Sequence, residues 1–433
     1  MSTALKNKIS RKTARVAVIG LGYVGLPLAV NFAKAGYRVT GLDMDEDRVR
    51  QVNARRSYIS DIPTAQLAAV VRAKRLSAHT DFELIRDMDV LIICVPTPLR
   101  RRYTPDISYI LSAVRTIAKY VKKHALIILE STTYPGTTEE LILPELQKGG
   151  RKVGRDFYLS FSPERIDPGN KLYDVTRIPK VVGGVEPKSG EYTALLYRKI
   201  IREIHVVSTA KSAEMTKLLE NSFRIINIGW INEVAMMCHK MDIDVWEVIE
   251  AAKTKPFGFM PFYPGLGVGG HCIPDDPLYL YWKAKHHGFS SRYIKLSADT
   301  NHNMPAYAYQ HLKDEMKKRK KTTRKMKVLV IGVTYKKDVR DLRKSPPLTL
   351  IEMMQDDGCA VDYHDPIIPY LKIGKIDLVS VELSRKVLGR YDVVITATDH
   401  TAVNWSFVLN NAKLIFDVKH MYGQKQSKNI IRF

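Results

Sequence analysis

Cysteine and long apolar segments are scarce in this chain of 433 residues. The four cysteines lie far apart: Cys94, Cys238, Cys272 and Cys359. They form no C-x-x-C pair, so neither a disulfide scaffold nor a zinc ribbon is expected. The longest apolar runs, such as 90–95 and 125–129, are far too short to cross a bilayer. The basic, polar first 15 residues do not form a signal peptide pattern. We therefore expect a protein of the reducing cytoplasm.

Acidic residues are also few. Asp and Glu number 45 against 68 Lys and Arg, which gives a net charge of +23. Such a surface favours anionic partners, among them nucleic acid, acidic membranes and phosphorylated small molecules. The basic runs 100–102 and 317–327 keep a nucleic-acid-binding protein open as an alternative. However, the basic residues are spread along the chain without a known nucleic-acid module, so a solubilising surface is the preferred interpretation.

The pattern of apolar segments predicts an α/β protein with a helical middle. Short β-branched strands are predicted at 15–19, 37–42, 90–95 and 126–129, with a helix at 26–35. Strands that alternate with helices indicate a doubly wound parallel sheet, placed here at residues 13–210.

The middle and the end of the chain differ from this first segment. Helical spacing predicts one long helix over 212–240 and a shorter one over 244–252, followed by a loop over 256–270. Residues 317–327 are expected to form a charged, solvated connector. Strands at 328–331, 360–363, 393–396 and 414–417 then repeat the opening pattern. The sequence thus predicts two Rossmann-like domains, at 13–210 and 323–433, joined by a helical domain at 211–310.

A glycine fingerprint follows the first predicted strand. Gly20, Gly22 and Gly25 have the G-x-G-x-x-G spacing, and Asp43 ends the next strand. Gly20 permits the tight turn, Gly22 lets a pyrophosphate approach, and Gly25 allows close packing of helix on strand. A carboxylate at Asp43 would bind a ribose 2′-hydroxyl and repel a 2′-phosphate, so NAD is expected rather than NADP.

Cys272 lies in an unusual setting for a structural cysteine. Glycines at 269 and 270 precede it, and Asp275 and Asp276 follow. Glycines allow close approach of a substrate carbon to the sulfur, and the neighbours are turn residues. We interpret Cys272 as a nucleophile, whereas Cys94 and Cys238 fit buried structural thiols.

Three further groups are weaker signals on their own. Lys217 and Asn221 are one helical turn apart and are able to donate to an oxyanion, although such pairs are mostly solvated surface. Glu164 and Arg165 form a charge pair in a loop. Lys336 follows a glycine turn at 332 and offers a charge for an anion.

Taken together, the motifs resemble the UDP-glucose/GDP-mannose dehydrogenase family. The resemblance runs from about Arg15 to the end of the chain. It rests on 18–27 (VIGLGYVGLP), 95–98 (VPTP), 130–137 (ESTTYPGT), 162–165 (SPER), Lys217 with Asn221, 264–272 (PGLGVGGHC) and 334–338 (TYKKD). It implies an N-terminal NAD-binding domain, a central helix that forms a homodimer core, and a C-terminal UDP-binding domain. The implied reaction is the four-electron oxidation of a nucleotide-sugar C6 hydroxyl to a carboxylate, with two NAD reduced.

The resemblance also implies roles for individual residues. The implied catalytic set is Cys272, Lys217, Asn221, Asp276, Glu164 and Thr133. The implied cofactor set is Gly20, Gly22, Tyr23, Val24, Gly25, Asp43, Arg48, Pro96, Thr97 and Thr133. The implied substrate set is Glu164, Arg165, Lys217, Asn221, Arg224, Phe262, Tyr263, Gly265, Gly269 and Lys336.

Within that family the loops look most like the UDP-N-acetylglucosamine 6-dehydrogenase branch. Three segments carry this likeness: 131–138, 162–165 with 167–170, and 255–259 before 262–264. UDP-glucose and UDP-N-acetylmannosamine are the alternative substrates. Ile166 and Asp275 depart from the pattern of that branch, which puts the preference at the sugar 2-position in doubt. A two-electron dehydrogenase of hydroxy acids is a further alternative, but it would need neither Cys272 nor a third domain.

Overall fold

The computed structural model describes residues 2–59, 62–100, 104–165, 176–425 and 427–433. The chain divides into two compact units, each treated by itself below. The first contains Met1–Glu220 and Trp282–Gly288, and the second Asn221–Tyr281 and Phe289–Phe433. Helices α8 (Ala210–Lys240) and α10 (Cys272–His286) pass from one unit to the other. The boundaries of the three predicted domains stay predictions.

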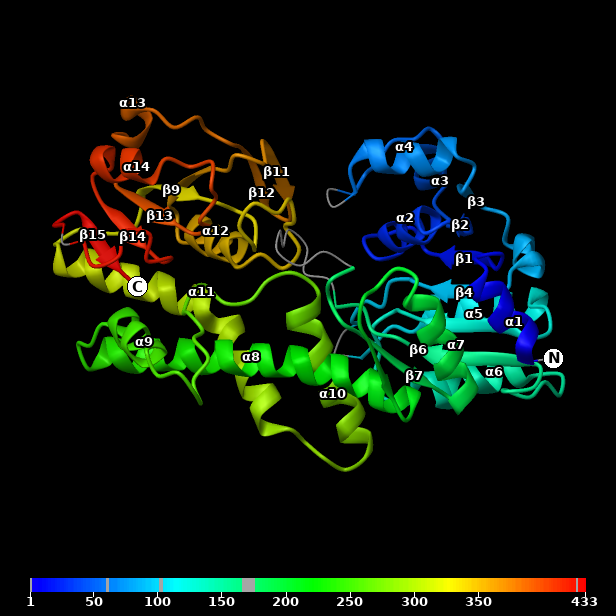
Figure 1. Ribbon diagram of the computed structural model, residues 1–433. Helices are drawn as coiled ribbons and strands as arrows, with labels where there is room; N and C mark the ends of the chain where they lie inside the picture. The colour runs from blue at the N-terminus through cyan, green and yellow to red at the C-terminus, as the bar shows by residue number, and fades with distance from the viewer. Residues whose placement is uncertain (1, 60–61, 101–103, 166–175, 426) are drawn as a thin grey trace. The chain divides into compact units, whose positions relative to one another are not determined.

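The first unit is built on an eight-stranded sheet in the order β3-β2-β1-β4-β5-β6-β7-β8 (Figure 1). Its strands are β1 (Arg15–Ile19), β2 (Arg38–Leu42), β3 (Leu76–His79), β4 (Val90–Ile93), β5 (Ala125–Leu129), β6 (Phe157–Phe161), β7 (Lys180–Gly184) and β8 (Ile204–Val207). Neighbouring strands are parallel except β6 and β7, which are antiparallel. The strand order reverses between β1 and β4, where α/β sheets bind ligands at the carboxyl ends of their strands.

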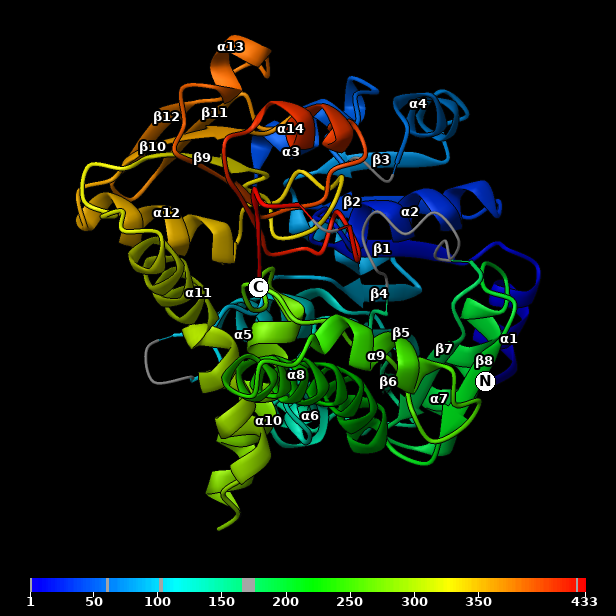
Figure 2. The same cartoon turned by 90° about the vertical axis from the view of Figure 1, so that its left-hand side faces the viewer.

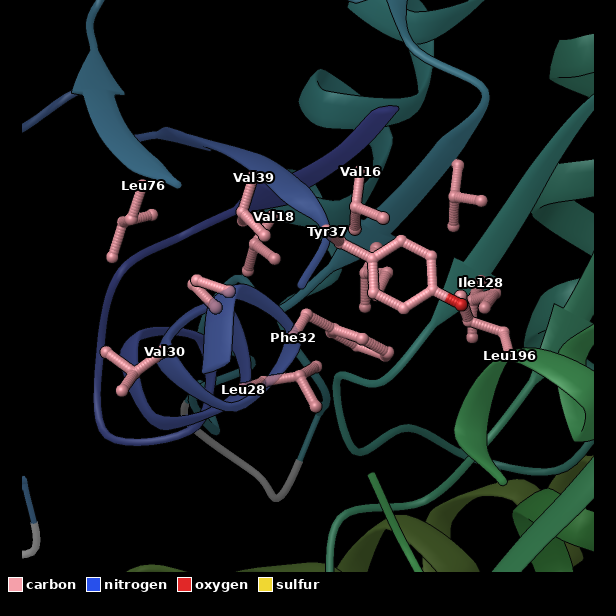
Figure 3. Packing of buried hydrophobic residues seen from close by; sticks show 14 of the residues in the cluster. Val16, Val18, Leu28, Val30, Phe32, Tyr37, Val39, Leu76, Ile128 and Leu196 are labelled. Carbon is pink, nitrogen blue, oxygen red and sulfur yellow. The ribbon is translucent and has the colours of Figure 1, made fainter. Parts of the chain in front are cut away.

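Helices cover both faces of this sheet because its central strands are apolar on both sides. Val16 and Val18 of β1 point into one core, and Ala17 and Ile19 into the other. The first core is closed by α1 (Ser2–Ser10), α2 (Gly25–Lys34), α4 (Thr64–Arg72) and α7 (Pro187–Tyr197). The second is closed by η1 (Phe82–Asp87), α5 (Ser108–Tyr120), η3 (Thr137–Ile142), α6 (Leu143–Gln147) and the start of α8. Figure 3 shows the first core, with Phe32 of α2 and Leu196 of α7 packed beside Tyr37. The predicted doubly wound arrangement is confirmed.

Helix α1 was not evident in the basic N-terminal arm. Leu5 and Ile9 are buried in the first core, and the Tyr37 hydroxyl donates to the Ile9 carbonyl at 2.8 Å. Lys8 Nζ lies 2.8 Å from Asp89 Oδ1. Only two apolar residues anchor the helix, too few for a periodic signal in the sequence.

The second unit contains a five-stranded parallel sheet, in the order β10-β9-β13-β14-β15. Its strands are β9 (Lys327–Ile331), β10 (Ala360–His364), β13 (Val393–Thr396), β14 (Ile415–Asp417) and β15 (Ile430–Arg432), with an antiparallel pair β11 (Tyr370–Ile373) and β12 (Ile376–Val379). Figure 2 shows β10 and β9 side by side. Helices α11 (Arg292–Lys318) and α12 (Pro346–Asp356) pack on one face, and α13 (Arg385–Leu388) and α14 (Trp405–Asn411) on the other.

The helical part of the second unit follows the prediction with one correction. Helix α8 spans Ala210–Lys240 and α9 spans Val245–Lys253, close to the predicted 212–240 and 244–252. The predicted connector 317–327 is wrong at its start, because α11 continues through Lys318. Lys318 pairs with Glu315 at 2.7 Å on that helix, which stabilises the last turn.

Candidate active site

The glycine fingerprint forms the turn between β1 and α2. Gly20 has φ +91°, and a Cβ there would lie 2.6 Å from the Cys94 carbonyl oxygen. A Cβ at Gly25 would lie 1.8 Å from the Gly20 carbonyl oxygen, so only glycine lets α2 approach β1 this closely. A Cβ at Gly22 would meet nothing within 4 Å. The space above Gly22 is therefore open where a pyrophosphate needs it, and these residues fit NAD.

Asp43 holds this turn from the end of β2. Its Oδ2 accepts the Leu21 backbone N–H at 2.7 Å, and Arg48 Nη1 lies 3.5 Å away. Its side chain is nearly buried, so the carboxylate is fixed beside the glycine turn. Tyr23 and Val24 lie in the same turn, and Pro96 and Thr97 lie three and four residues after the end of β4.

The segment 130–137 follows β5 and carries Thr133, which is buried. Glu214 of α8 holds this segment: its carboxylate accepts the backbone N–H groups of Gly136 at 2.6 Å and Thr138 at 2.9 Å. Burial raises the pKa of Glu214 to about 7, against the lowering effect of those hydrogen bonds. Sequence reasoning missed Glu214, which precedes Lys217 by three residues on the same helix.

The predicted charge pair of Glu164 with Arg165 is wrong. The guanidinium of Arg165 binds Glu220 at 2.6 Å, whereas Glu164 faces Lys180 at 3.6 Å. Lys180 in turn contacts Glu130 at 2.5 Å. Two residues adjacent in sequence point apart because each has an opposite charge on a different element. Ile166 and the run 167–170 lie outside the described residues.

In the second unit, Cys272 is the first residue of α10 and its side chain is exposed. The prediction that it lies in a turn is therefore wrong by one residue, since the turn ends at His271. The N-terminus of a helix stabilises a thiolate by its partial positive charge. The guanidinium of Arg343 also interacts electrostatically with Cys272.

One turn further along α10, Asp276 is fully buried. Its Oδ2 accepts a hydrogen bond from Asn221 Nδ2 at 2.6 Å. Lys217 and Asn221 are both buried on α8, so the interpretation of this pair as solvated surface is wrong. A buried amide next to a buried carboxylate is held in one orientation, with Asp276 as the acceptor.

The loop before Cys272 is held by a pair of asparagines that sequence reasoning missed. Asn232 Oδ1 accepts the Gly265 N–H at 3.0 Å, and Asn232 Nδ2 donates to Asn301 Oδ1 at 2.9 Å. A Cβ at Gly267 would lie 2.3 Å from the Asn301 carbonyl oxygen. Asn side chains on helices are commonly exposed to solvent. Only the burial of Asn232 and Asn301 therefore shows that they support this loop.

The other side of this loop packs against the segment after β9. The Gly270 N–H donates to the Arg343 carbonyl at 2.8 Å, and a Cβ at Gly269 would lie 2.4 Å from the Cβ of Tyr335. Lys344 binds Asp275, which is buried. Lys344 thus compensates the buried charge of Asp275, the residue that departs from the expected pattern.

The remaining predicted substrate residues are spread over the second unit. Tyr263 donates to Glu250 at 2.9 Å, and Phe262 packs edge-on against Phe223. Lys336 lies in the segment after β9, and Arg224 is exposed on α8. Lys419 follows β14, and burial lowers its pKa. A Cβ at Gly265 would lie 3.8 Å from the Lys419 ammonium, so Lys419 is a cation beside this loop that sequence reasoning missed.

Two kinds of feature are absent from the described part of the chain. No helix there is long and apolar enough to span a membrane. No group of three or more His, Cys, Asp or Glu side chains there is arranged to hold a metal ion.

Three segments of the chain match three domains of one enzyme family, the UDP-glucose/GDP-mannose dehydrogenases. Residues 14–201 match its NAD binding domain, 211–303 its central domain and 329–424 its UDP binding domain. The order of the three matches is the order predicted from the motifs.

Similar proteins cover nearly the whole chain. A UDP-N-acetyl-D-glucosamine 6-dehydrogenase of Pseudomonas aeruginosa is 36% identical over 424 residues, covering 96% of this chain and 99% of that protein. A UDP-N-acetyl-D-mannosamine dehydrogenase of Pyrococcus horikoshii is 35% identical over 413 residues, covering 94% and 96%. The solved structure of a UDP-D-ManNAc dehydrogenase from Pyrococcus horikoshii superposes with a TM-score of 0.87 at 33% identity, covering 96% of this chain and 98% of that one. None of these supports the nucleic-acid alternative. The chain belongs to the UDP-glucose/GDP-mannose dehydrogenase family and is an NAD-dependent UDP-sugar dehydrogenase.

Proposed function

We propose that the enzyme oxidises the C6 hydroxyl of UDP-N-acetylglucosamine to a carboxylate, in two steps on one active site. The position of Cys272 in the fold is the main support for this proposal. Cys272 is exposed at the N-terminus of α10, one turn before an Asp276 that is hydrogen-bonded to Asn221. A two-electron dehydrogenase has no use for such a thiol, whereas oxidation of an aldehyde requires a nucleophile to make its carbon tetrahedral.

In the first step the alcohol becomes an aldehyde. NAD, when bound, accepts one hydride in each of the two oxidations. The ammonium of Lys217 and the amide of Asn221 stabilise the negative charge that develops on the C6 oxygen. Asp276, directly or through a water, takes the hydroxyl proton. The Asn221–Asp276 hydrogen bond of 2.6 Å keeps this donor and this acceptor in register.

In the second step Cys272 adds to the aldehyde. Its thiolate forms a C–S bond and the aldehyde oxygen takes the proton that Asp276 accepted in the first step, which gives a thiohemiacetal. Loss of a hydride and return of that proton to Asp276 leave a thioester on Cys272. The helix N-terminus, Arg343 and the ammonium of Lys217 favour the thiolate form that this step needs.

Hydrolysis releases the product. Glu164 takes a proton from a water molecule whose oxygen attacks the thioester carbonyl, and Asp276 helps position that water. The C–S bond breaks, Cys272 leaves as a thiolate, and the sugar leaves as a carboxylate. Thr133, buried beside the NAD-binding edge of the sheet, orients water or cofactor near the reacting carbon.

The preference for N-acetylglucosamine rests on the family resemblance of the segments 131–138, 162–170 and 255–264, and on the loop before Cys272, where N-acetylmannosamine enzymes often carry an arginine that this chain lacks. UDP-N-acetylmannosamine and UDP-glucose are the alternatives. A pocket that differs by a methyl-sized group discriminates by only about 1–3 kcal/mol, so measured rates on all three sugars decide the substrate. We place the reaction in the cytoplasm because Cys272 must stay reduced and all four cysteines are thiols.

We further propose that the enzyme is a homodimer through α8. Five exposed apolar residues lie on one face of this helix at spacings of four and seven: Met215, Leu219, Phe223, Trp230 and Met237. A stripe of exposed apolar side chains along one helix face needs a partner, and a second copy offers the same stripe. Trp230→Glu is expected to halve the mass in sedimentation, whereas Val379→Glu, an exposed residue of β12, leaves it unchanged.

The experiment that tests the reaction counts NADH per mole of limiting UDP-sugar. The wild type is expected to yield two per UDP-N-acetylglucosamine and little on the other two sugars. Cys272→Ala is expected to lose this yield, and Cys238→Ala, a buried thiol of the helical core, to keep it. Two NADH per UDP-glucose would keep the mechanism and reject the substrate. One NADH per sugar in the wild type would reject the four-electron reaction.

A further inference from the structure

Two buried threonines share a hydrogen bond in the segment that follows β5. Thr133 is 2% exposed and Thr137 is fully buried. Their Oγ1 atoms are 2.5 Å apart, so one hydroxyl donates its proton to the other. A hydroxyl has one proton and two lone pairs, so the pair by itself allows either direction. The contacts around the pair decide between the two directions.

The hydroxyl of Thr137 has a second contact, which takes its proton. Thr137 Oγ1 donates to the backbone carbonyl oxygen of Tyr134, 2.7 Å away. Two oxygens at this distance with no proton between them would repel each other, because both would present lone pairs. The single proton of Thr137 therefore points at the Tyr134 carbonyl, and the bond between the two threonines runs from Thr133 to Thr137.

The phenol of Tyr134 does not change this direction. Burial raises the pKa of the phenol, and a hydrogen bond with Thr137 only partly offsets the effect of burial, so the phenol is protonated at neutral pH. A protonated phenol is able to donate, and the oxygen of Thr137 has two lone pairs. One lone pair serves Thr133 and the other serves the phenol.

The backbone around the pair is held in place from α8. The carboxylate of Glu214 accepts the N–H of Gly136 at 2.6 Å, the N–H of Thr138 at 2.9 Å and the hydroxyl of Thr138 at 2.7 Å. These bonds fix the residues on both sides of Thr137. The direction of the bond from Thr133 is therefore a fixed property of the folded segment.

This inference rests on the role proposed for Thr133, which orients water or cofactor. We infer that Thr137 is a positioning residue that takes the proton of Thr133, so that Thr133 meets its ligand only as a hydrogen-bond acceptor. The ligand group must then be a donor, either the O–H of a water molecule or the carboxamide N–H of the cofactor. A water that donates to Thr133 keeps its lone pairs for another direction, as attack on a carbonyl carbon requires.

The inference predicts the sign of the effect of Thr137→Val. This variant lacks the hydroxyl, so Thr133 keeps its oxygen but its proton loses the acceptor. That proton is then free to face the donor of the ligand, and we expect turnover or cofactor affinity to fall by about three- to tenfold, the worth of one hydrogen bond. Thr137→Ser restores the hydroxyl and is expected to stay within about twofold of the wild type. If Thr133 were a donor, Thr137→Val would leave the rate unchanged or raise it.

A double-mutant cycle shows whether Thr137 acts through Thr133. Thr133→Val removes the acceptor and is expected to cost about tenfold. In that background Thr137→Val should add nothing, because two residues that serve one interaction are not additive.

Thr193→Val is the matched control. Thr193 of α7 is also fully buried, and its Oγ1 donates to Ser160 Oγ at 2.9 Å on the other face of the same sheet. Loss of this hydroxyl is expected to lower stability in urea unfolding about as much as Thr137→Val does. It is expected to leave turnover and cofactor affinity unchanged.

Two measurements on the full-length enzyme follow each variant. Calorimetric titration with NAD gives the affinity without turnover, and stopped-flow NADH formation from UDP-N-acetylglucosamine gives kcat and KM. Titration with the 3-acetylpyridine analogue of NAD, in which a methyl group replaces the amide NH₂, identifies the donor. If the carboxamide is the donor, Thr133→Val and Thr137→Val weaken the binding of NAD but not of the analogue. If water is the donor, NAD affinity is unchanged and only kcat falls.

The outcomes separate this inference from the reaction on which it rests. A loss in Thr137→Val that is absent in Thr137→Ser and absent in the Thr133→Val background supports the inference, whichever donor is found. An unchanged or faster Thr137→Val overturns it, and so does a loss that persists in the Thr133→Val background. Thr137→Ala takes the place of Thr137→Val if that variant does not fold. Wild-type turnover and NAD affinity in Thr133→Val would overturn the inference together with the role of Thr133, whereas one NADH per sugar in the wild type would refute the proposed reaction itself.

Discussion

The two sheets of this enzyme begin with the same turn. Gly20 follows β1 with φ +91°, and Gly332 follows β9 with φ +85°. In each case an aspartate at the end of the neighbouring strand accepts the next backbone N–H: Asp43 at 2.7 Å and Asp365 at 2.8 Å. A Cβ on either glycine would lie 2.6 Å from a carbonyl oxygen just after the strand on the other side, that of Cys94 after β4 or of Thr398 after β13. The same turn structure therefore occurs twice in the chain.

The two turns differ in the segment that comes after each of them. After Gly20 the chain enters α2 at Gly25, so a helix N-terminus faces the open space above the turn. After Gly332 no helix begins until Pro346, and the intervening segment carries lysines. Among the described residues, Asp43 contacts the glycine turn without a buried histidine beside it, whereas Asp365 is also bound by the buried His400 at 3.1 Å. The shared turn thus positions only the backbone, and the elements after it decide whether a helix or side chains meet the phosphates.

The largest effect is expected from breaking the first turn. In Gly25→Ala the new Cβ meets the Gly20 carbonyl, so β1 and α2 must separate, at a cost of about 3 kcal/mol in the free energy of unfolding. Calorimetry measures the loss, and hydrogen exchange of β1 and β9 assigns it to the first unit.

Gly22→Ala is the control for that prediction. Its Cβ meets no protein atom within 4 Å, so stability is retained while the KM for NAD rises. Equal stability of the two variants would contradict the tight packing at Gly25, and an unchanged KM in Gly22→Ala would contradict the phosphate site.

The second-largest effect is expected from substituting Asp365, which differs in its contacts from Asp43. The carboxylate of Asp365 accepts hydrogen bonds from three backbone N–H groups and from His400. In Asp365→Asn the side-chain NH₂ would face some of these donors whichever way the amide is oriented. We expect the second unit to lose about 3 kcal/mol. Asp43 accepts only two backbone N–H groups, so Asp43→Asn is expected to cost less stability and to act mainly on the KM for NAD. Urea unfolding and NAD titration measure the two effects.

The pH dependence of the unfolding free energy is a further test of Asp365→Asn. Burial raises the pKa of Asp365, but hydrogen bonds from His400 and the backbone outweigh it and lower the pKa below its ordinary value. A lowered pKa contributes stability above about pH 4 that is lost as the pH falls. The difference in unfolding free energy between wild type and Asp365→Asn should therefore shrink toward acid pH. A constant difference would show that the carboxylate charge is not the cause.

Local patterns in the sequence were enough for some of these features. The roles of Gly20, Gly25 and Asp43 could be predicted because strand, turn and next strand are close in sequence, and each glycine has a steric reason. The start of α10 at Cys272 could not, because the glycines and Pro274 indicated a turn. A proline in the first turn of a helix costs little, since its missing N–H has no partner there.

Contacts set by the order of the sheet were beyond local patterns. Lys180 meets Glu130 and Glu164 only because β7 reverses direction at the edge of the sheet. Asn232 and Asn301 meet across two long helices, and neither belongs to a recognisable motif. Buried polar groups of this kind are visible only after folding, when the absence of water requires each to have a partner.

The smallest effect is expected from substituting a lysine in the segment after Gly332, where no helix N-terminus is present to meet the nucleotide. If side chains rather than a helix N-terminus meet the nucleotide, Lys336→Met raises the KM for the UDP-sugar by about tenfold, the loss of one charge-assisted hydrogen bond. Lys337 is the matched control: it is half-exposed and lies 3.9 Å from Asp399, a surface pair of little energetic weight. Lys337→Met is expected to change KM less than about twofold. Added salt should raise KM more in the wild type than in Lys336→Met, because screening acts on the charge that the variant lacks. Equal KM values in both variants would assign phosphate binding to the backbone of the turn, and the two domains would then differ less than their sequences suggest.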